Sequence, residues 1–124
     1  MMTDEHGAWA IEHYVAPDGS SPVEEFLDSV DPKTRARFRW SIEQLRARNT
    51  QAREPLVKHL EDKLWELREE SATNIYRMIY FFFTGRRIVL LHGFAKKTQK
   101  TPPQELAIAR RRYEDFLRRE GESR

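Results

Sequence analysis

The order of hydrophobic and polar positions predicts a strand, two helices, three more strands and a final helix. Apolar and polar residues alternate over residues 9–15, which is typical of a short strand. Pro17-Asp18-Gly19 then predicts a turn. Further strands are predicted over residues 64–69, 75–83 and 88–94, with a tight turn at residues 84–87 between the last two.

Capping residues and prolines mark where the first two helices begin. Ser21 precedes Pro22 and is followed by Glu24, which is a capping-box pattern, and Asp31 precedes Pro32 in the same way. The helices are predicted to run to about residue 30 and to about residue 49, and we expect them to form a hairpin.

Apolar residues at helical spacing define the buried faces of the second and the last helix. On the second helix this face consists of Phe38, Ile42 and Leu45. The last helix is predicted from Pro102-Pro103 to about residue 119, and its stripe consists of Leu106, Ala109, Tyr113, Phe116 and Leu117.

These elements predict an α+β fold of β-α-α-β-β-β-α order. The strand over residues 75–83 is apolar on both faces, so we expect it near the middle of a small, mainly antiparallel sheet. That sheet would pack on the helical hairpin, with the C-terminal helix added. A chain of 124 residues is long enough to bury a core, and we expect residues 1–124 to form one domain.

Composition narrows the function classes. The chain has no cysteine, so disulfide and thiolate chemistry are excluded, and a reducing cytoplasm is the expected compartment. The longest apolar run covers residues 78–83, whereas a membrane-spanning helix needs about 20 residues, so no membrane association is expected. Residues 86–124 carry 11 Lys or Arg against 5 Asp or Glu, an excess that favours contact with nucleic acid at one end of the molecule.

The stretch over residues 75–102 contains the candidate chemistry. Arg77 lies inside an apolar strand, where an unpaired charge is costly to bury. Cations and a histidine gather at the end of the next strand: His92, Lys96, Lys97 and Lys100. Cations at one edge of a sheet suggest a phosphate site. The alternative is a structural ion pair of Arg77 with Glu66 or Glu12.

Three motifs resemble one family. Tyr76-Arg77 followed by Tyr80, the segment HGFAKKTQKTP over residues 92–102 and the segment LWELR over residues 64–68 are similar to the phage-derived Gp49-like branch of HigB toxins. That branch belongs to the RelE/ParE toxin superfamily. The resemblance implies a RelE-like fold and a toxin of a type II toxin–antitoxin system. It further implies a ribosome-dependent endoribonuclease that cleaves mRNA, and a HigA-like helix-turn-helix antitoxin as partner.

The resemblance also assigns site residues. Arg77 occupies the position of the superfamily's phosphate-binding arginine, and Lys96 and Lys97 match a basic segment that carries further catalytic cations. Because side chains alternate along a strand, at most one of these two lysines should share a pocket with Arg77.

The remaining candidates come from the need for an acid, a base and cations when a 2′-hydroxyl attacks the neighbouring phosphate. His92 and Glu66 are candidates for acid or base, and His59, which precedes the second strand, is expected to reach the same face as His92. The candidate RNA-binding residues are Lys63, Arg68, Lys100 and His59. No ligand spacing for a metal is present, and no cofactor is expected.

Two other functions remain open. A ParE-like module that binds and inhibits DNA gyrase would need no catalytic residues. A degenerate phage protein would keep the fold and the antitoxin surface only.

Overall fold

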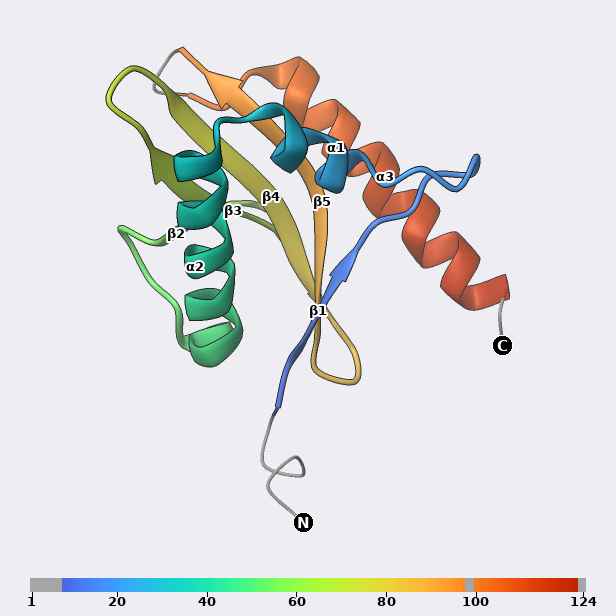
Figure 1. The fold of residues 1–124 in the computed structure, drawn as a ribbon. Coiled ribbons are helices and arrows are strands. Elements are labelled where there is room, and N and C mark those ends of the chain that lie inside the picture. Colours follow the sequence, from blue (N-terminus) through green and yellow to red (C-terminus); the bar gives the residue numbers. More distant parts are fainter. Residues whose placement is uncertain (1–7, 98–99, 123–124) are drawn as a thin grey trace.

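Five strands form a sheet in the computed structural model, which describes residues 8–97 and 100–122 (Figure 1). The strand order is β1-β5-β4-β3-β2, and β4 lies in the middle as its two apolar faces predict. β1 pairs with β5 in parallel, and all other neighbours are antiparallel. The strands are β1 (Ala10–His13), β2 (Val57–Glu61), β3 (Leu64–Glu70), β4 (Ile75–Phe83) and β5 (Arg87–Lys96).

The helices begin where the capping residues predict. Helix α1 (Pro22–Ser29) is capped by the Ser21 side chain, and α2 (Pro32–Arg48) by that of Asp31, which accepts a hydrogen bond from the Thr34 backbone at 3.1 Å. The short helix η2 (Asn49–Gln51) follows α2, and α3 (Pro103–Glu122) ends the described chain.

Helices cover both faces of the sheet (Figure 1). On one face, α1 and α2 pack against alternate residues of β4 that include Tyr76, Met78 and Tyr80. On the other face, α3 packs against the intervening residues, among them Ile79 and Phe81. The α+β class and the mainly antiparallel sheet are therefore confirmed, and Arg77 lies on the α3 face by strand alternation.

The predicted element order lacks one strand. The structure has β-α-α-β-β-β-β-α, because residues 57–61 pair with β3 as an additional edge strand. Its sequence, Val-Lys-His-Leu-Glu, has little β-branched or aromatic character, so it is held by pairing rather than by its own propensity. The predicted stripe of α3 is wrong at Leu117, which is 37% exposed.

A bulge in β5 changes which side chains face α3. Ile79 of β4 lies opposite His92, but Tyr80 lies opposite Leu90, so Leu91 is an extra residue. Leu91 packs on the α3 face, and the following His92 contacts α3 as well. Beyond the bulge the alternation is therefore reversed relative to the start of the strand.

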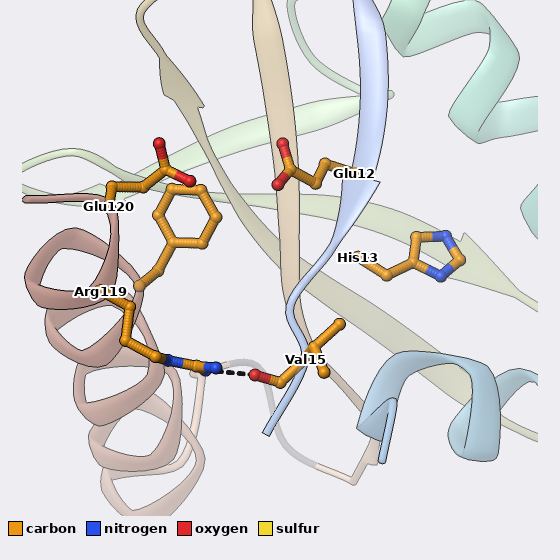
Figure 2. Close-up of a pocket in the computed structure, with 6 residues that line it drawn as sticks. Glu12, His13, Val15, Arg119 and Glu120 are labelled. Carbon is orange, nitrogen blue, oxygen red and sulfur yellow. Dashed lines mark hydrogen bonds between the residues drawn. The ribbon is translucent and has the colours of Figure 1, made fainter. Parts of the chain in front are cut away.

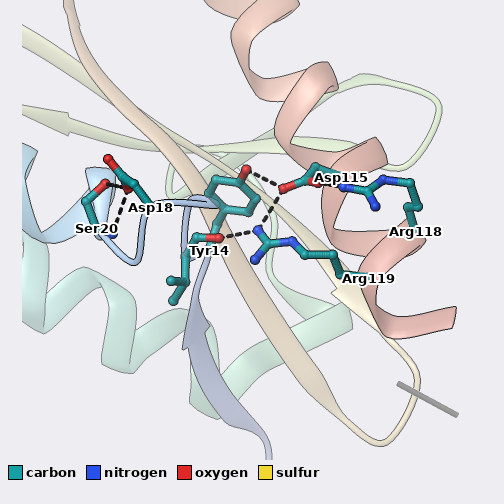
Figure 3. A network of polar contacts seen from close by, with 7 residues as sticks. Tyr14, Asp18, Ser20, Asp115, Arg118 and Arg119 are labelled. Atoms are coloured by element: carbon teal, nitrogen blue, oxygen red, sulfur yellow. Dashed lines mark hydrogen bonds and ion pairs between the residues drawn. The ribbon is translucent and has the colours of Figure 1, made fainter. Parts of the chain in front are cut away.

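Polar contacts join the N-terminal segment to α3. The Tyr14 hydroxyl donates a hydrogen bond of 2.6 Å to Asp115, and Arg119 pairs with the same carboxylate (Figure 3). In the described part of the chain, no helix combines the length and apolar character needed to span a membrane.

Candidate functional site

Three charged side chains from adjacent strands are buried together on the α3 face of the sheet. Glu66 comes from β3, Arg77 from β4 and Lys96 from β5, and these residues are 2%, 3% and 5% exposed, respectively. The cluster is placed near the end of the sheet where β5 leads toward α3. We refer to these three residues as the buried charge cluster.

Glu66 and Arg77 form its best-defined contact. Arg77 Nε lies 3.4 Å from Glu66 Oε2, and Arg77 Nη1 donates a 2.7 Å hydrogen bond to the Tyr76 carbonyl. The Nε–H finds no hydrogen-bond acceptor of suitable geometry among the described residues. Thr101 Oγ1 donates to Glu66 Oε1 at 3.0 Å, so the second carboxylate oxygen is held as well. The contact with Glu66, and not with Glu12, is thus the one that Arg77 makes.

Positive charge exceeds negative charge around the cluster. Burial lowers the pKa of Lys96, and the nearby Arg77 lowers it further, while Glu66 acts in the opposite direction. Burial also lowers the pKa of Arg77, opposed by Glu66 and reinforced by Arg68. Arg68 and Lys58 add positive charge around the cluster and Glu70 adds negative charge, and the excess of cations has the electrostatic character of an anion site.

Strand alternation places the two adjacent lysines on different sides, and the bulge in β5 decides which of them faces α3. Lys96 is buried on the same side as Arg77, whereas Lys97 is exposed at the end of the strand. Lys100 is exposed as well, and Thr98 and Gln99 of the basic motif lie outside the described residues. Strand parity alone did not distinguish these lysines, because the register shift precedes them.

His92 belongs to a separate polar network formed with α3. Arg112 donates to His92 Nδ1 at 3.0 Å, so Nε2 carries the proton and donates to Glu105 at 2.6 Å. Burial lowers the pKa of His92, Glu105 opposes this and Arg112 adds to it. The ring stacks on Phe94, which itself lies opposite Arg77 across β4 and β5. The structure therefore places Phe94 between His92 and Lys96 along β5, and Ile79 between His92 and Glu66 across the sheet.

The other predicted binding residues are dispersed. Arg68 lies directly opposite Arg77 on β3 and is 3.9 Å from Glu54. Lys63 is exposed in the β2–β3 turn, at the other end of β3. The expectation that His59 reaches the same face as His92 is wrong: its ring packs against Trp65, which belongs to the α2 side of the sheet. His59 is on β2, the strand that the sequence pattern did not indicate.

The excess of basic residues after residue 86 is compensated in part by ion pairs within the fold. Arg87 forms ion pairs with Glu12 at 2.8 Å and with Glu120 at 3.1 Å, and Arg110 pairs with Glu61. A hollow between β1 and α3 is lined partly by Glu12 and Glu120 (Figure 2). These two carboxylates lie among the basic residues of the hollow, so the basic residues do not form one continuous positive surface at this place.

Two residues that were not predicted as site residues become prominent in the structure. Thr101 contacts Glu66 from the segment that precedes α3. Trp40 of α2 is 62% exposed, and a signal for this existed, because Trp40 lies off the stripe of Phe38, Ile42 and Leu45. Among the described residues, no group of three or more His, Asp or Glu side chains is arranged to hold a metal ion.

The α+β fold and the motifs are consistent with a toxin of the RelE/HigB type. The family described as "Phage derived protein Gp49-like (DUF891)" matches residues 25–114, which is most of the chain. The protein therefore belongs to the Gp49-like family, a RelE/HigB-type toxin family. Membership indicates a toxin of a toxin–antitoxin pair, with an antitoxin as its partner. The search of curated proteins found no match.

Proposed function

We propose that this toxin is a metal-independent endoribonuclease that cleaves mRNA on translating ribosomes. The observation that carries the proposal is the buried charge cluster, in which β3, β4 and β5 bring a carboxylate, a guanidinium and an ammonium group together in a member of a RelE/HigB-type family. These are the three kinds of group that RNA cleavage by the internal 2′-hydroxyl requires.

Each member of the cluster has a role in this reaction. Glu66 accepts the proton of the 2′-hydroxyl, whose oxygen attacks the adjacent phosphorus. Arg77 stabilises the negative charge on the pentavalent phosphate, since a guanidinium bonds two phosphate oxygens at once. Lys96 donates a proton to the 5′ oxygen as the P–O5′ bond breaks. The products are a 2′,3′-cyclic phosphate and a 5′-hydroxyl, so no water, metal or cofactor is consumed.

A lowered pKa makes Lys96 a better acid than an ordinary lysine. Its pKa is lowered by burial and by Arg77, which brings it closer to neutral pH. The protonated amine is the required form. The rate should therefore fall as the pH rises through this lowered pKa, below the pH at which an unperturbed lysine would lose its proton.

The cluster must open when the substrate binds. Arg77 and Lys96 are 3% and 5% exposed in the free protein, so a phosphate reaches them only after neighbouring side chains move apart. The Thr101–Glu66 hydrogen bond is the contact that we expect to break, because it holds the carboxylate oxygen that Arg77 does not pair with. Glu66 is then released toward the 2′-hydroxyl.

The partners follow from the same proposal. The ribosome positions the message, and a HigA-like helix-turn-helix antitoxin binds and neutralises the toxin in the cytoplasm. His92, Lys97 and Lys100 lie outside the three-residue cluster, so we assign catalysis to Glu66, Arg77 and Lys96 and give Lys97 and Lys100 an electrostatic role toward RNA.

Mapping of cellular transcripts tests the proposal. Expression of the chain without its antitoxin should arrest bacterial growth and produce cuts within coding regions, detected by primer extension on abundant mRNAs. Blocking translation initiation should remove the cuts if the ribosome positions the message. Intact transcripts together with DNA-damage signals would instead indicate ParE-like inhibition of gyrase.

A further inference from the structure

Trp40 is a large aromatic side chain that the fold leaves exposed. It lies on α2 and is 62% exposed, whereas Trp9 and Trp65 pack against the core formed with α1 and α2. An exposed indole does not gain the hydrophobic free energy of burial, and for an aromatic ring this free energy is large. Tryptophan is enriched at binding interfaces, where one part of the ring is buried and the indole N–H can remain hydrated.

Hollows flank this indole on two sides. One has a volume of about 430 Å³ and lies between α2 and residues 51–56, and the other, also about 430 Å³, lies along the first half of α2. Trp40, Ser41 and Glu69 line both hollows, so the side chain of Trp40 stands where they meet. Sites for small ligands typically have volumes of about 300–1,000 Å³. We call the two hollows together the Trp40 groove.

Cations outnumber carboxylates in the Trp40 groove. Its basic residues are Lys33, Arg37, Arg48, Arg53 and Arg68, and its acidic residues are Glu54 and Glu69. Both carboxylates are already engaged within the protein. Glu54 lies 3.9 Å from Arg68, and Glu69 accepts a hydrogen bond from Ser41 at 2.8 Å and lies 3.6 Å from Arg37. The groove therefore complements an anionic ligand that also offers a flat apolar face.

The Trp40 groove lies on the α2 face of the sheet and the buried charge cluster on the α3 face, and Arg68 of β3 is close to both. Arg68 lines the groove and lies directly opposite Arg77 in the β3–β4 pairing. Its charge also lowers the pKa values of Arg77 and Lys96, which places it within electrostatic reach of both. A single RNA strand that passes around the rim of the sheet at Arg68 would reach both sites.

We propose that the Trp40 groove is a subsite for single-stranded RNA, in which an unpaired base stacks on the Trp40 indole. Phosphates on either side of that base contact the arginines of the groove, Arg48 above all. This inference rests on the proposed function, since it names where a nucleotide outside the scissile bond binds. Stacking on an aromatic ring combined with a basic track is the common way in which proteins hold unpaired nucleotides.

Binding of an uncleavable oligonucleotide tests the subsite separately from the chemistry. The probe is a short, fluorescein-labelled 2′-O-methyl oligoadenylate, which has no 2′-hydroxyl to attack, and the readout is fluorescence anisotropy with the whole chain. Trp40→Ala should weaken binding by roughly 5- to 100-fold, whereas Trp40→Phe should retain most of the affinity. Circular dichroism of each variant confirms that the fold is kept.

A matched pair of arginine variants tests whether the arginines of the Trp40 groove contact phosphates. Arg48→Ala should weaken binding and reduce its dependence on salt, because a phosphate contact is lost. Arg39 serves as the control, since it is on the same helix but outside the groove, where it lies 3.8 Å from Glu24. Arg39→Ala should leave the affinity within about twofold of wild type, as expected for a surface pair.

The outcomes separate this inference from the proposed function. Unchanged oligoadenylate affinity in Trp40→Ala overturns the subsite even if transcripts are cut. Loss of antitoxin binding in Trp40→Ala, with unchanged oligonucleotide affinity, would also overturn it and assign the groove to the antitoxin. If transcripts stay intact while Trp40→Ala still weakens binding and Trp40→Phe restores it, the subsite stands and the endoribonuclease assignment fails.

Discussion

A half-buried polar network and the buried charge cluster lie on the same face of the sheet, and they differ in how completely their groups are paired. In the network of His92, Glu105 and Arg112, both ring nitrogens have partners, at 2.6 and 3.0 Å, and Arg112 also donates to the Leu91 carbonyl at 2.9 Å. In the buried charge cluster, Arg77 Nε has no acceptor of good geometry among the described residues, and its ion pair with Glu66 is longer, at 3.4 Å.

This difference separates a structural network from a candidate reactive one. Buried polar groups that are fully hydrogen-bonded make a core rigid, and they have no capacity left for a ligand. A buried guanidinium whose Nε meets its carboxylate only at 3.4 Å, beside a second cation, leaves positive charge that an incoming phosphate can neutralise. The comparison predicts that substitutions in the buried charge cluster change cleavage, whereas substitutions in the His92 network change stability.

The largest expected effect is that of Lys96→Ala. Loss of a general acid should reduce the rate of mRNA cleavage at saturating substrate by about 10²- to 10⁴-fold. Lys97→Ala is the matched control, because Lys97 is adjacent in sequence but exposed. Lys97→Ala should reduce the cleavage rate only slightly, and the difference from wild type should become smaller at higher salt. Rates measured on programmed ribosomes distinguish the two, and equal losses would mean a diffuse electrostatic patch.

A somewhat smaller loss is expected for Arg77→Ala. Removing one charge-assisted contact to the transition state costs about 2.7–4 kcal/mol, or about a hundred- to a thousand-fold in rate. Growth arrest and transcript cleavage should therefore disappear while the protein remains folded. Thermal melting and antitoxin binding measured on the same variant provide the check. A variant that melts far below wild type would identify the Glu66–Arg77 pair as structural, and a fully toxic one would exclude Arg77 from catalysis.

Arg112→Ala should act on stability instead. The change leaves His92 Nδ1 and the Leu91 carbonyl without their donor, which typically costs about 1–3 kcal/mol. Urea unfolding should show the loss, while the cleavage rate per folded molecule should stay near wild type. Arg111→Ala, at the exposed neighbouring position, should be nearly neutral. A large drop in cleavage without a drop in stability would place the His92 network in the active site.

The smallest expected effect concerns pH. Burial lowers the pKa of His92 in the folded protein, so the unfolded chain binds its proton at a higher pH than the folded chain does. Stability should therefore decrease as the pH falls below the ordinary histidine value of about 6.5. Glu105 opposes this shift and Arg112 adds to it. His92→Gln, which does not titrate, should make the urea midpoint of unfolding depend less on pH between pH 7 and pH 5. An unchanged dependence on pH would assign the acid sensitivity to other groups.

Much of the fold could be predicted from the sequence because its signals are local. Ser21-Pro22 and Asp31-Pro32 begin α1 and α2 as predicted, and β4 has the predicted bounds. Each of these depends on residues within a few positions of one another. The strand β2 could not be predicted in this way, because residues 57–61 become a strand only through hydrogen bonds to β3.

The candidate site could be defined only from the sequence and the tertiary structure together. The sequence alone, through the position of Arg77 in an apolar strand and through the Gp49-like motifs, determined the toxin family and pointed to cations near the end of β5. Only the tertiary structure decided that Lys96 and not Lys97 is buried beside Arg77 and Glu66, and that His92 and His59 lie elsewhere. The physical reason is that a one-residue bulge at Leu91 reverses which side chains face α3. Such a register shift arises from the pairing of β5 with β4 and leaves no mark in the sequence of either strand.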